Sequence, residues 1–132
     1  MAEASSISLE GDPSLRWGVA STIPVNLAGA VLFSPLGAAA RGIVGMAPIE
    51  PIYGAVLATW IFAIGLAFVA AWRARRVDVS LLAIACVGKL SFVIAMVVAA
   101  LVGRGSWLAA AAAWPDLALA IVFMTGALRA RA

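Results

Sequence analysis

Two oppositely charged side chains lie inside neighbouring apolar stretches of this sequence. Lys89, the only lysine, lies within LLAIACVGKLSFVIAMVVAALV, and Asp116 lies within SWLAAAAAWPDLALAIVFMTGAL. Each charge costs about 2.5–3.5 kcal/mol at the centre of a membrane helix, so such residues commonly mark ion pathways, proton relays or ligand sites. A direct or water-bridged ion pair would offset much of this cost. We therefore expect Lys89 and Asp116 to face each other.

The role of such a pair is open on the sequence alone. It could serve a carrier, or it could be a structural ion pair that fixes the register of two helices. Alternatively, each group could be uncharged, because burial disfavours the charged form. Asn26 lies at a similar depth in the first apolar stretch. Its amide could complete a polar cluster with Lys89 and Asp116, or it could only hold two helices together through a hydrogen bond worth about 0.6–2 kcal/mol.

Other chemistry finds little support in the sequence. The chain has no histidine and a single cysteine, Cys86, which removes the commonest metal ligand, an internal disulfide and a Cys-X-X-Cys redox pair. No nucleophile–base pair, metal-ligand cluster or glycine-rich phosphate loop is visible. We expect neither enzyme activity nor a metal ion or cofactor. The net charge of +3 does not indicate nucleic-acid binding, because the arginines lie at the ends of apolar runs.

Membrane helices must position these residues. Hydrophobic residues make up 65% of the 132 positions and charged residues 11%, whereas soluble domains are about half apolar and about a quarter charged. Several windows exceed the roughly 18 apolar residues that mark a membrane-crossing helix. We predict an all-α, four-transmembrane-helix bundle in a single membrane domain over residues 13–132. The spans are expected at about residues 15–33, 51–72, 79–102 and 107–128.

The segments around these spans carry further signals. Residues 1–12 are polar and predict a frayed N-terminal tail. Residues 34–50 are rich in Gly and Pro and predict a short interfacial helix between the first two spans, with Arg41 pointing to water. Pro115 leaves two possibilities for the fourth span, a kinked full-length helix or a new helix that starts at Pro115. We favour the kinked span, because residues 116–128 alone reach only ~20 Å against a ~30 Å hydrocarbon core.

Small residues recur every four positions along the second span. Such a stripe lets a partner helix approach closely, although it is common in membrane helices. It comprises Ala55, Thr59, Ala63, Ala67 and Ala71. We predict that this face is buried against another helix of the bundle or of an oligomer.

Arginines divide unevenly between the two ends of the predicted spans. One end carries Arg16, Arg73, Arg75, Arg76, Arg129 and Arg131, whereas the other carries Arg41 and Arg104. The positive-inside rule makes the arginine-rich end cytoplasmic. We therefore predict that both termini are cytoplasmic and that the cluster of Arg73, Arg75 and Arg76 faces anionic lipid.

Three groups of residues in the second half carry a resemblance to known proteins. They are Trp60, Phe62 and Gly65 in the second span, Gly88 and Lys89 in the third, and Asp116 with the apolar run to Phe123 in the fourth. Over about residues 51–128, the chain resembles a broad set of small, mostly uncharacterised bacterial inner-membrane proteins, some of them loosely DoxX-like. The resemblance implies a four-helix membrane bundle and no defined activity.

The combined features favour two functions of different classes. We expect a structural or accessory subunit of the bacterial inner membrane, acting as a homo-oligomer or with a membrane partner protein in the lipid bilayer. The alternative is a small-molecule or proton-coupled carrier that uses the pair of Lys89 and Asp116.

Overall fold

The computed structural model describes residues 6–130 as a helical chain with one small pair of strands. In chain order the elements are β1 Ser6–Ser8, α1 Pro13–Phe33, η1 Pro35–Gly37, α2 Ala38–Ile43, α3 Pro51–Ala74, β2 Arg76–Asp78, α4 Val79–Leu101, α5 Trp107–Ala112 and α6 Trp114–Arg129. The expectation of an all-α class is confirmed for the described residues.

Capping side chains explain where the long helices begin. The Asp12 carboxylate accepts a hydrogen bond from the backbone N–H of Leu15 at 3.0 Å, and Pro13 opens α1. Glu50 likewise caps α3, and Asp78 caps α4. A polar side chain at this position satisfies a backbone N–H that has no partner within the helix. Polar residues between the apolar runs therefore set the helix starts.

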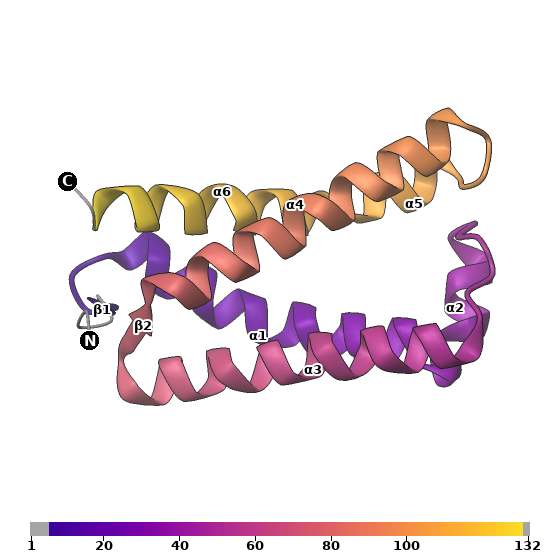
Figure 1. The fold of residues 1–132 in the computed structure, drawn as a ribbon. Coiled ribbons are helices and arrows are strands. Elements are labelled where there is room, and N and C mark those ends of the chain that lie inside the picture. Colours follow the sequence, from indigo (N-terminus) through magenta and orange to yellow (C-terminus); the bar gives the residue numbers. More distant parts are fainter. Residues whose placement is uncertain (1–5, 131–132) are drawn as a thin grey trace.

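The helices form two antiparallel pairs that share one contact surface (Figure 1). α1 packs along α3, α4 packs along α6, and α1 also contacts α6. Glycine permits this last contact, because a Cβ atom on Gly18 would lie 2.7 Å from Cγ1 of Val122, and one on Gly126 would lie 3.0 Å from Cδ1 of Leu15. The close approach of α1 and α6 therefore joins the two pairs.

The best-packed core lies toward the end of the molecule that carries both described termini (Figure 1). Phe68 of α3 and Phe123 of α6 are fully buried and stack with ring centroids 5.2 Å apart. Leu15 and Val19 from α1 and Leu82 from α4 complete this cluster. All four long helices therefore meet at one end, whereas α3 and α4 diverge from their short connection toward the other end (Figure 1).

The N-terminal segment is ordered from Ser6 onward, so the expected frayed tail is wrong for residues 6–12. β1 pairs with β2 in antiparallel register, with Ile7 opposite Val77. The buried side chains of Leu9 and Val77 extend the core under this pair, which explains why the polar segment is held in place. Residues 1–5, the rest of the expected tail, lie outside the described residues.

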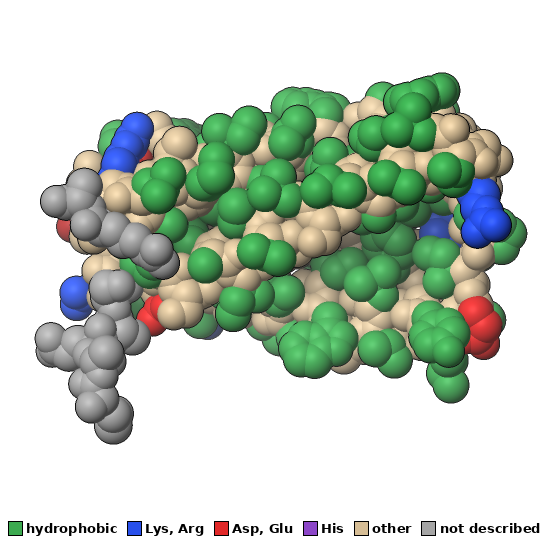
Figure 2. Space-filling model, turned by 45° about the horizontal axis from the view of Figure 1, so that its top comes forward, with side chains coloured by type: hydrophobic (Ala, Val, Ile, Leu, Met, Phe, Trp, Pro, Cys, Tyr) green, Lys and Arg blue, Asp and Glu red, His purple; other side chains and the backbone are tan. Residues whose placement is uncertain are grey.

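Within residues 6–130, three helical stretches are long and apolar enough to cross a membrane. Two further helices joined by a sharp bend make a fourth if they form one span. The three are Pro51–Ala74, Val79–Leu101 and Trp107–Arg129, and the bent pair joins Pro13–Phe33 to Pro35–Ile43 at an angle of 83°. On the face shown in Figure 2, hydrophobic side chains cover the length of the molecule and charged side chains lie at its two ends. These features indicate a membrane protein.

Arg41 does not point to water, which corrects the expectation for the segment after α1. Its side chain is buried and donates hydrogen bonds to the backbone carbonyls of Leu32 and of Ser34, the latter at 2.9 Å. The last carbonyls of a helix lack partners within the helix, and a cation near them is favourable. Arg41 therefore caps the C-terminal end of α1 and joins α2 to it.

Candidate functional site

Lys89, Asp116 and Asn26 come together between three helices. The Nζ of Lys89 lies 2.5 Å from Oδ1 of Asp116 and 3.3 Å from Oδ1 of Asn26. The Lys89 side chain is 7% exposed and that of Asp116 is 19% exposed. We call these three residues the polar triad. An ion pair this well buried interacts more strongly than a surface pair, because little water screens it.

The three members of the polar triad are positioned by three different helices. Lys89 lies near the middle of α4, and Asn26 lies near the middle of α1. Gly65 of α3 lets α3 pack beside Asn26, since a Cβ atom there would lie 3.3 Å from the Cβ of Asn26. The fourth stretch is interrupted at Ala113, and this break places Asp116 in the first turn of α6. The positive end of the α6 dipole supports a carboxylate at that position.

The polar triad lines a cavity of about 570 Å³. Every helix from α1 to α6 contributes to its wall, and the wall is almost entirely apolar. Apart from the indole of Trp60, the polar triad supplies all the polar side chains of the lining. Figure 2 shows this hollow among the hydrophobic side chains between the two helix pairs. Cavities of roughly 300–1,000 Å³ with apolar walls and a few converging polar groups are typical ligand sites.

Hydrogen-bonding capacity remains at the wall of this cavity. Lys89 has three N–H donors, and its described partners are Oδ1 of Asp116 and Oδ1 of Asn26. Within residues 6–130, Oδ2 of Asp116 accepts no side-chain hydrogen bond. The polar triad carries no net formal charge, because the charges of Lys89 and Asp116 cancel. It can therefore offer both a donor and an acceptor to a neutral polar group.

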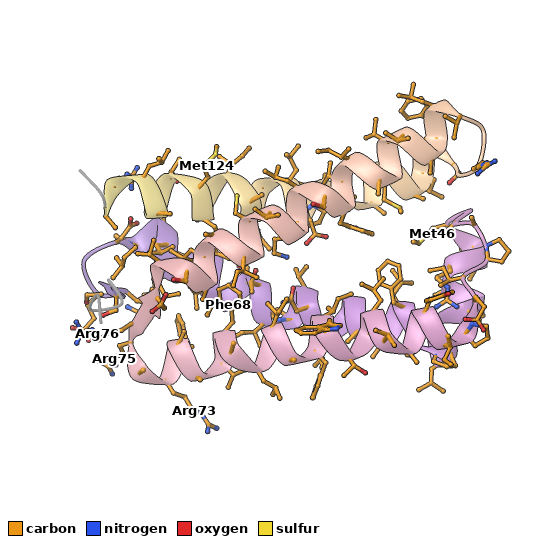
Figure 3. All side chains as sticks on the ribbon, viewed as in Figure 1. Met46, Phe68, Arg73, Arg75, Arg76 and Met124 are labelled. Carbon is orange, nitrogen blue, oxygen red and sulfur yellow. The ribbon has the colours of Figure 1, made fainter. Side chains whose placement is uncertain are left out.

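The cavity is closed on the side of the core around Phe68, Phe123 and Leu82, which we call the terminal-end core because it lies at the end that carries both described termini. Leu82 lies two helical turns before Lys89 on α4 and is fully buried. The stacked rings of Phe68 and Phe123 fill the space between α3 and α6 at that end, and Figure 3 shows Phe68 pointing from α3 into the interior. Met46, which lines the cavity, lies at the opposite end in the same view. A bound molecule would therefore meet the polar triad at the inner end of the cavity.

No protein-family model, curated protein or solved structure matches this chain. The resemblance to small DoxX-like membrane proteins stays a hypothesis that rests on the residues quoted for it. The functional argument therefore depends on the geometry of the cavity and the polar triad.

The structure places the small-residue stripe of α3 largely on the outside of the chain. Ala55, Thr59 and Ala63 are exposed, Ala67 is half-buried, and Ala71 is buried in the terminal-end core. The face of α3 that packs on α1 is instead formed by Gly54, Ala58 and Gly65. Within a single chain, the predicted packing face is therefore displaced around the helix, and the stripe is left free for contact with lipid or with another chain.

The basic cluster lies where the charge pattern predicts, at the end that carries both described termini. Figure 3 shows Arg73, Arg75 and Arg76 together at this end. Arg75 donates to Glu10 at 2.6 Å, and both side chains are largely exposed.

Cys86 is buried in α4, and its Sγ donates to the backbone carbonyl of Ala120 at 3.4 Å. Cys86 therefore packs α4 against α6.

Gly88 is the cavity residue whose role sequence reasoning missed. A Cβ atom on Gly88 would meet no heavy atom within 4 Å, and the residue lines the cavity next to Lys89. A glycine inside a helix costs about 0.5–1 kcal/mol relative to alanine, and no close helix contact requires one at this position. A glycine next to the single lysine, inside an apolar helix, was therefore a signal in the sequence. In the structure, the missing side chain keeps the cavity wall open.

Proposed function

We propose that this protein binds a small, mainly apolar molecule in its membrane-facing cavity and acts as a small-molecule carrier. The observation that carries the proposal is a cavity of about 570 Å³ whose apolar wall holds a buried ion pair. A pair that served only to fix helix register would need no space beside it. Here Lys89 and Asp116 both line the open volume, as expected of groups that meet a ligand.

A cavity-filling variant tests this proposal. We expect Gly88→Leu to abolish saturable binding, because the new side chain would extend into open space without displacing a neighbour. The measurement is photolabelling by a neutral aryl-diazirine in native membranes, with the labelled residues located by mass spectrometry. In the wild-type protein, cavity residues such as Phe92 should be labelled in a saturable way, and Gly88→Leu should lower that labelling about tenfold or more.

Ala83→Leu is the matched control for this experiment. Ala83 lies on the same helix and is exposed, but it does not line the cavity. The control should keep the saturable labelling, and non-saturable labelling of outward-facing residues should be equal in all three proteins. Equal saturable labelling of the wild-type protein and Gly88→Leu would contradict the proposal, because the saturable site would then lie outside the space that Gly88 leaves open.

A structural or accessory role, the first expectation from the sequence, stays a prediction. The surface on which it would rest is the exposed part of the small-residue stripe, Ala55, Thr59 and Ala63. Small residues on an outward face permit close packing of another membrane helix. The two roles are compatible, because this surface and the cavity involve different faces of α3.

We further propose a bacterial inner-membrane location with both termini in the cytoplasm. Support comes from the described arginines, of which Arg16, Arg73, Arg75, Arg76 and Arg129 lie at one end. Positive charge in short loops favours the cytoplasmic side. Reporter fusions at the C-terminus and after Arg76 should both read cytoplasmic, whereas a fusion near Arg41 should read external. A periplasmic C-terminus would contradict this orientation.

A further inference from the structure

We propose that the ligand is a neutral, single-chain amphiphile that passes sideways from the bilayer into the cavity between α3 and α4. Its hydroxyl or amide head would lie on the polar triad, and its chain would lie along the apolar wall. This inference rests on the proposed binding function and specifies the ligand class and its route.

The route follows from residues that line the cavity and are also exposed on the surface. Trp60 of α3 is 66% exposed, and Ile84 of α4 is 59% exposed, yet both line the cavity. The edge of the cavity therefore reaches the outer surface between α3 and α4, and Figure 2 shows the hollow on this face. Both helices are candidate membrane spans, so this edge faces hydrocarbon, and a molecule dissolved in the bilayer can reach it without crossing water.

The head group follows from the charge balance of the polar triad. A hydroxyl group can donate to Oδ2 of Asp116 and accept from the third N–H of Lys89. An added anion would lie close to the Asp116 carboxylate, and an added cation would lie close to the Lys89 ammonium. Either would leave an unmatched charge in an apolar cavity, which is strongly unfavourable. A neutral head with both a donor and an acceptor matches the site.

The single chain follows from the size and shape of the cavity. A volume of about 570 Å³ lies in the range that holds one drug-sized molecule, which favours one chain over a two-chain lipid. The terminal-end core of Phe68, Leu82 and Phe123 is fully buried and blocks passage beyond the polar triad. The head therefore stops at the triad, while the chain extends toward Trp60 and the gap between α3 and α4.

Three ligands of equal chain length and different head charge test the charge match. Oleyl alcohol, oleate and oleylamine would each compete with the aryl-diazirine for the cavity of the wild-type protein at neutral pH. We expect the alcohol to displace the label at a concentration about tenfold or more below that needed for either charged ligand. Equal potency of all three, or a preference for oleate or oleylamine, would overturn the inference.

Charge variants at the polar triad should change this order. Asp116→Asn keeps the size of the side chain and leaves the Lys89 charge unmatched, so oleate should become the best competitor. Lys89→Gln should make oleylamine the best competitor. An unchanged order in either variant, once near-native melting of that variant is established, would show that the triad does not contact the head. If neither variant folds, the order of potency of the three ligands on the wild-type protein alone decides whether a neutral head is preferred.

A variant at the gap tests the route. Ile84→Trp adds bulk at the exposed edge of the cavity and should slow displacement by oleyl alcohol severalfold. Val98→Trp is the matched control, because Val98 is exposed on α4 and does not line the cavity. An unchanged rate in Ile84→Trp would overturn the sideways route. Absence of any saturable label in the wild-type protein would instead overturn the proposed binding function, so the two failures are distinguishable.

Discussion

Asp116→Leu should lower the free energy of unfolding by about 3–5 kcal/mol, because it leaves a buried charge without its partner. Lys89→Met should also be destabilising, but less so. The residue left behind, Asp116, is the more exposed of the two and is supported by the N-terminus of α6. Lys89, in contrast, would keep only Asn26. Thermal melting in detergent and accumulation in membranes measure these losses.

The double variant Lys89→Met with Asp116→Leu is the control for this prediction. It removes both charges and should be markedly more stable than Asp116→Leu alone, because apolar replacements of a buried ion pair are often neutral. Losses that simply add in the double variant would show that the two residues are not coupled. A stable double variant that no longer binds the neutral photolabel in a saturable way would support a functional role for the pair.

Phe68→Ala should also be strongly destabilising. The Phe68 ring is fully buried and stacks on Phe123, so its removal leaves a large void between α3 and α6. Truncation of a buried phenylalanine typically costs about 3–5 kcal/mol through lost contacts and the remaining cavity. We expect a marked drop in melting temperature in detergent and a loss of the closed inner end of the ligand cavity.

Phe62→Ala is the control on the same helix. Phe62 is 45% exposed, so its truncation removes few contacts within the chain, and we expect a change within about 0.5 kcal/mol. Equal destabilisation by the two substitutions would contradict the expected difference between the buried ring of Phe68 and the exposed ring of Phe62. It would indicate instead that the outer face of α3 is packed against another chain.

The apolar helices and the partnership of Lys89 with Asp116 could be predicted because each depends on a large energetic term. Long runs of apolar residues leave few alternatives to membrane helices. A lysine and an aspartate inside such runs are each costly without a partner. The chain has no other lysine, and Asp116 is the acidic residue of the adjacent apolar run. Their approach to 2.5 Å agrees with the expectation that they would face each other.

The packing face of α3 could not be chosen from the sequence, because two stripes of small residues lie side by side. Gly54, Ala58 and Gly65 pack on α1, whereas the neighbouring stripe that begins with Ala55 lies outside. The two stripes differ by one residue, or about 100° around the helix. Both permit close approach of another helix, so only the position of α1 decides which one is used.

Interactions between distant segments account for the other corrections. Ser6–Ser8 is ordered because β2 offers it backbone partners, although the segment itself is short and polar. Arg41 is buried because the carbonyl groups at the end of α1 accept its hydrogen bonds. A local pattern of polarity does not record such partners. It predicts exposure for any arginine or polar tail that lacks an obvious neighbour in sequence.

The sequence by itself determined the helical class, the apolar character of the long helices and the need of Lys89 and Asp116 for partners, because hydrophobicity and the cost of a buried charge act on each segment alone. The tertiary structure decided what surrounds that pair. α3 and α4 meet near their connection and diverge beyond it (Figure 1), and Gly88 leaves the wall open. The resulting cavity depends on how helices far apart in sequence are inclined and packed. That is a property of all their contacts together, which no single segment encodes.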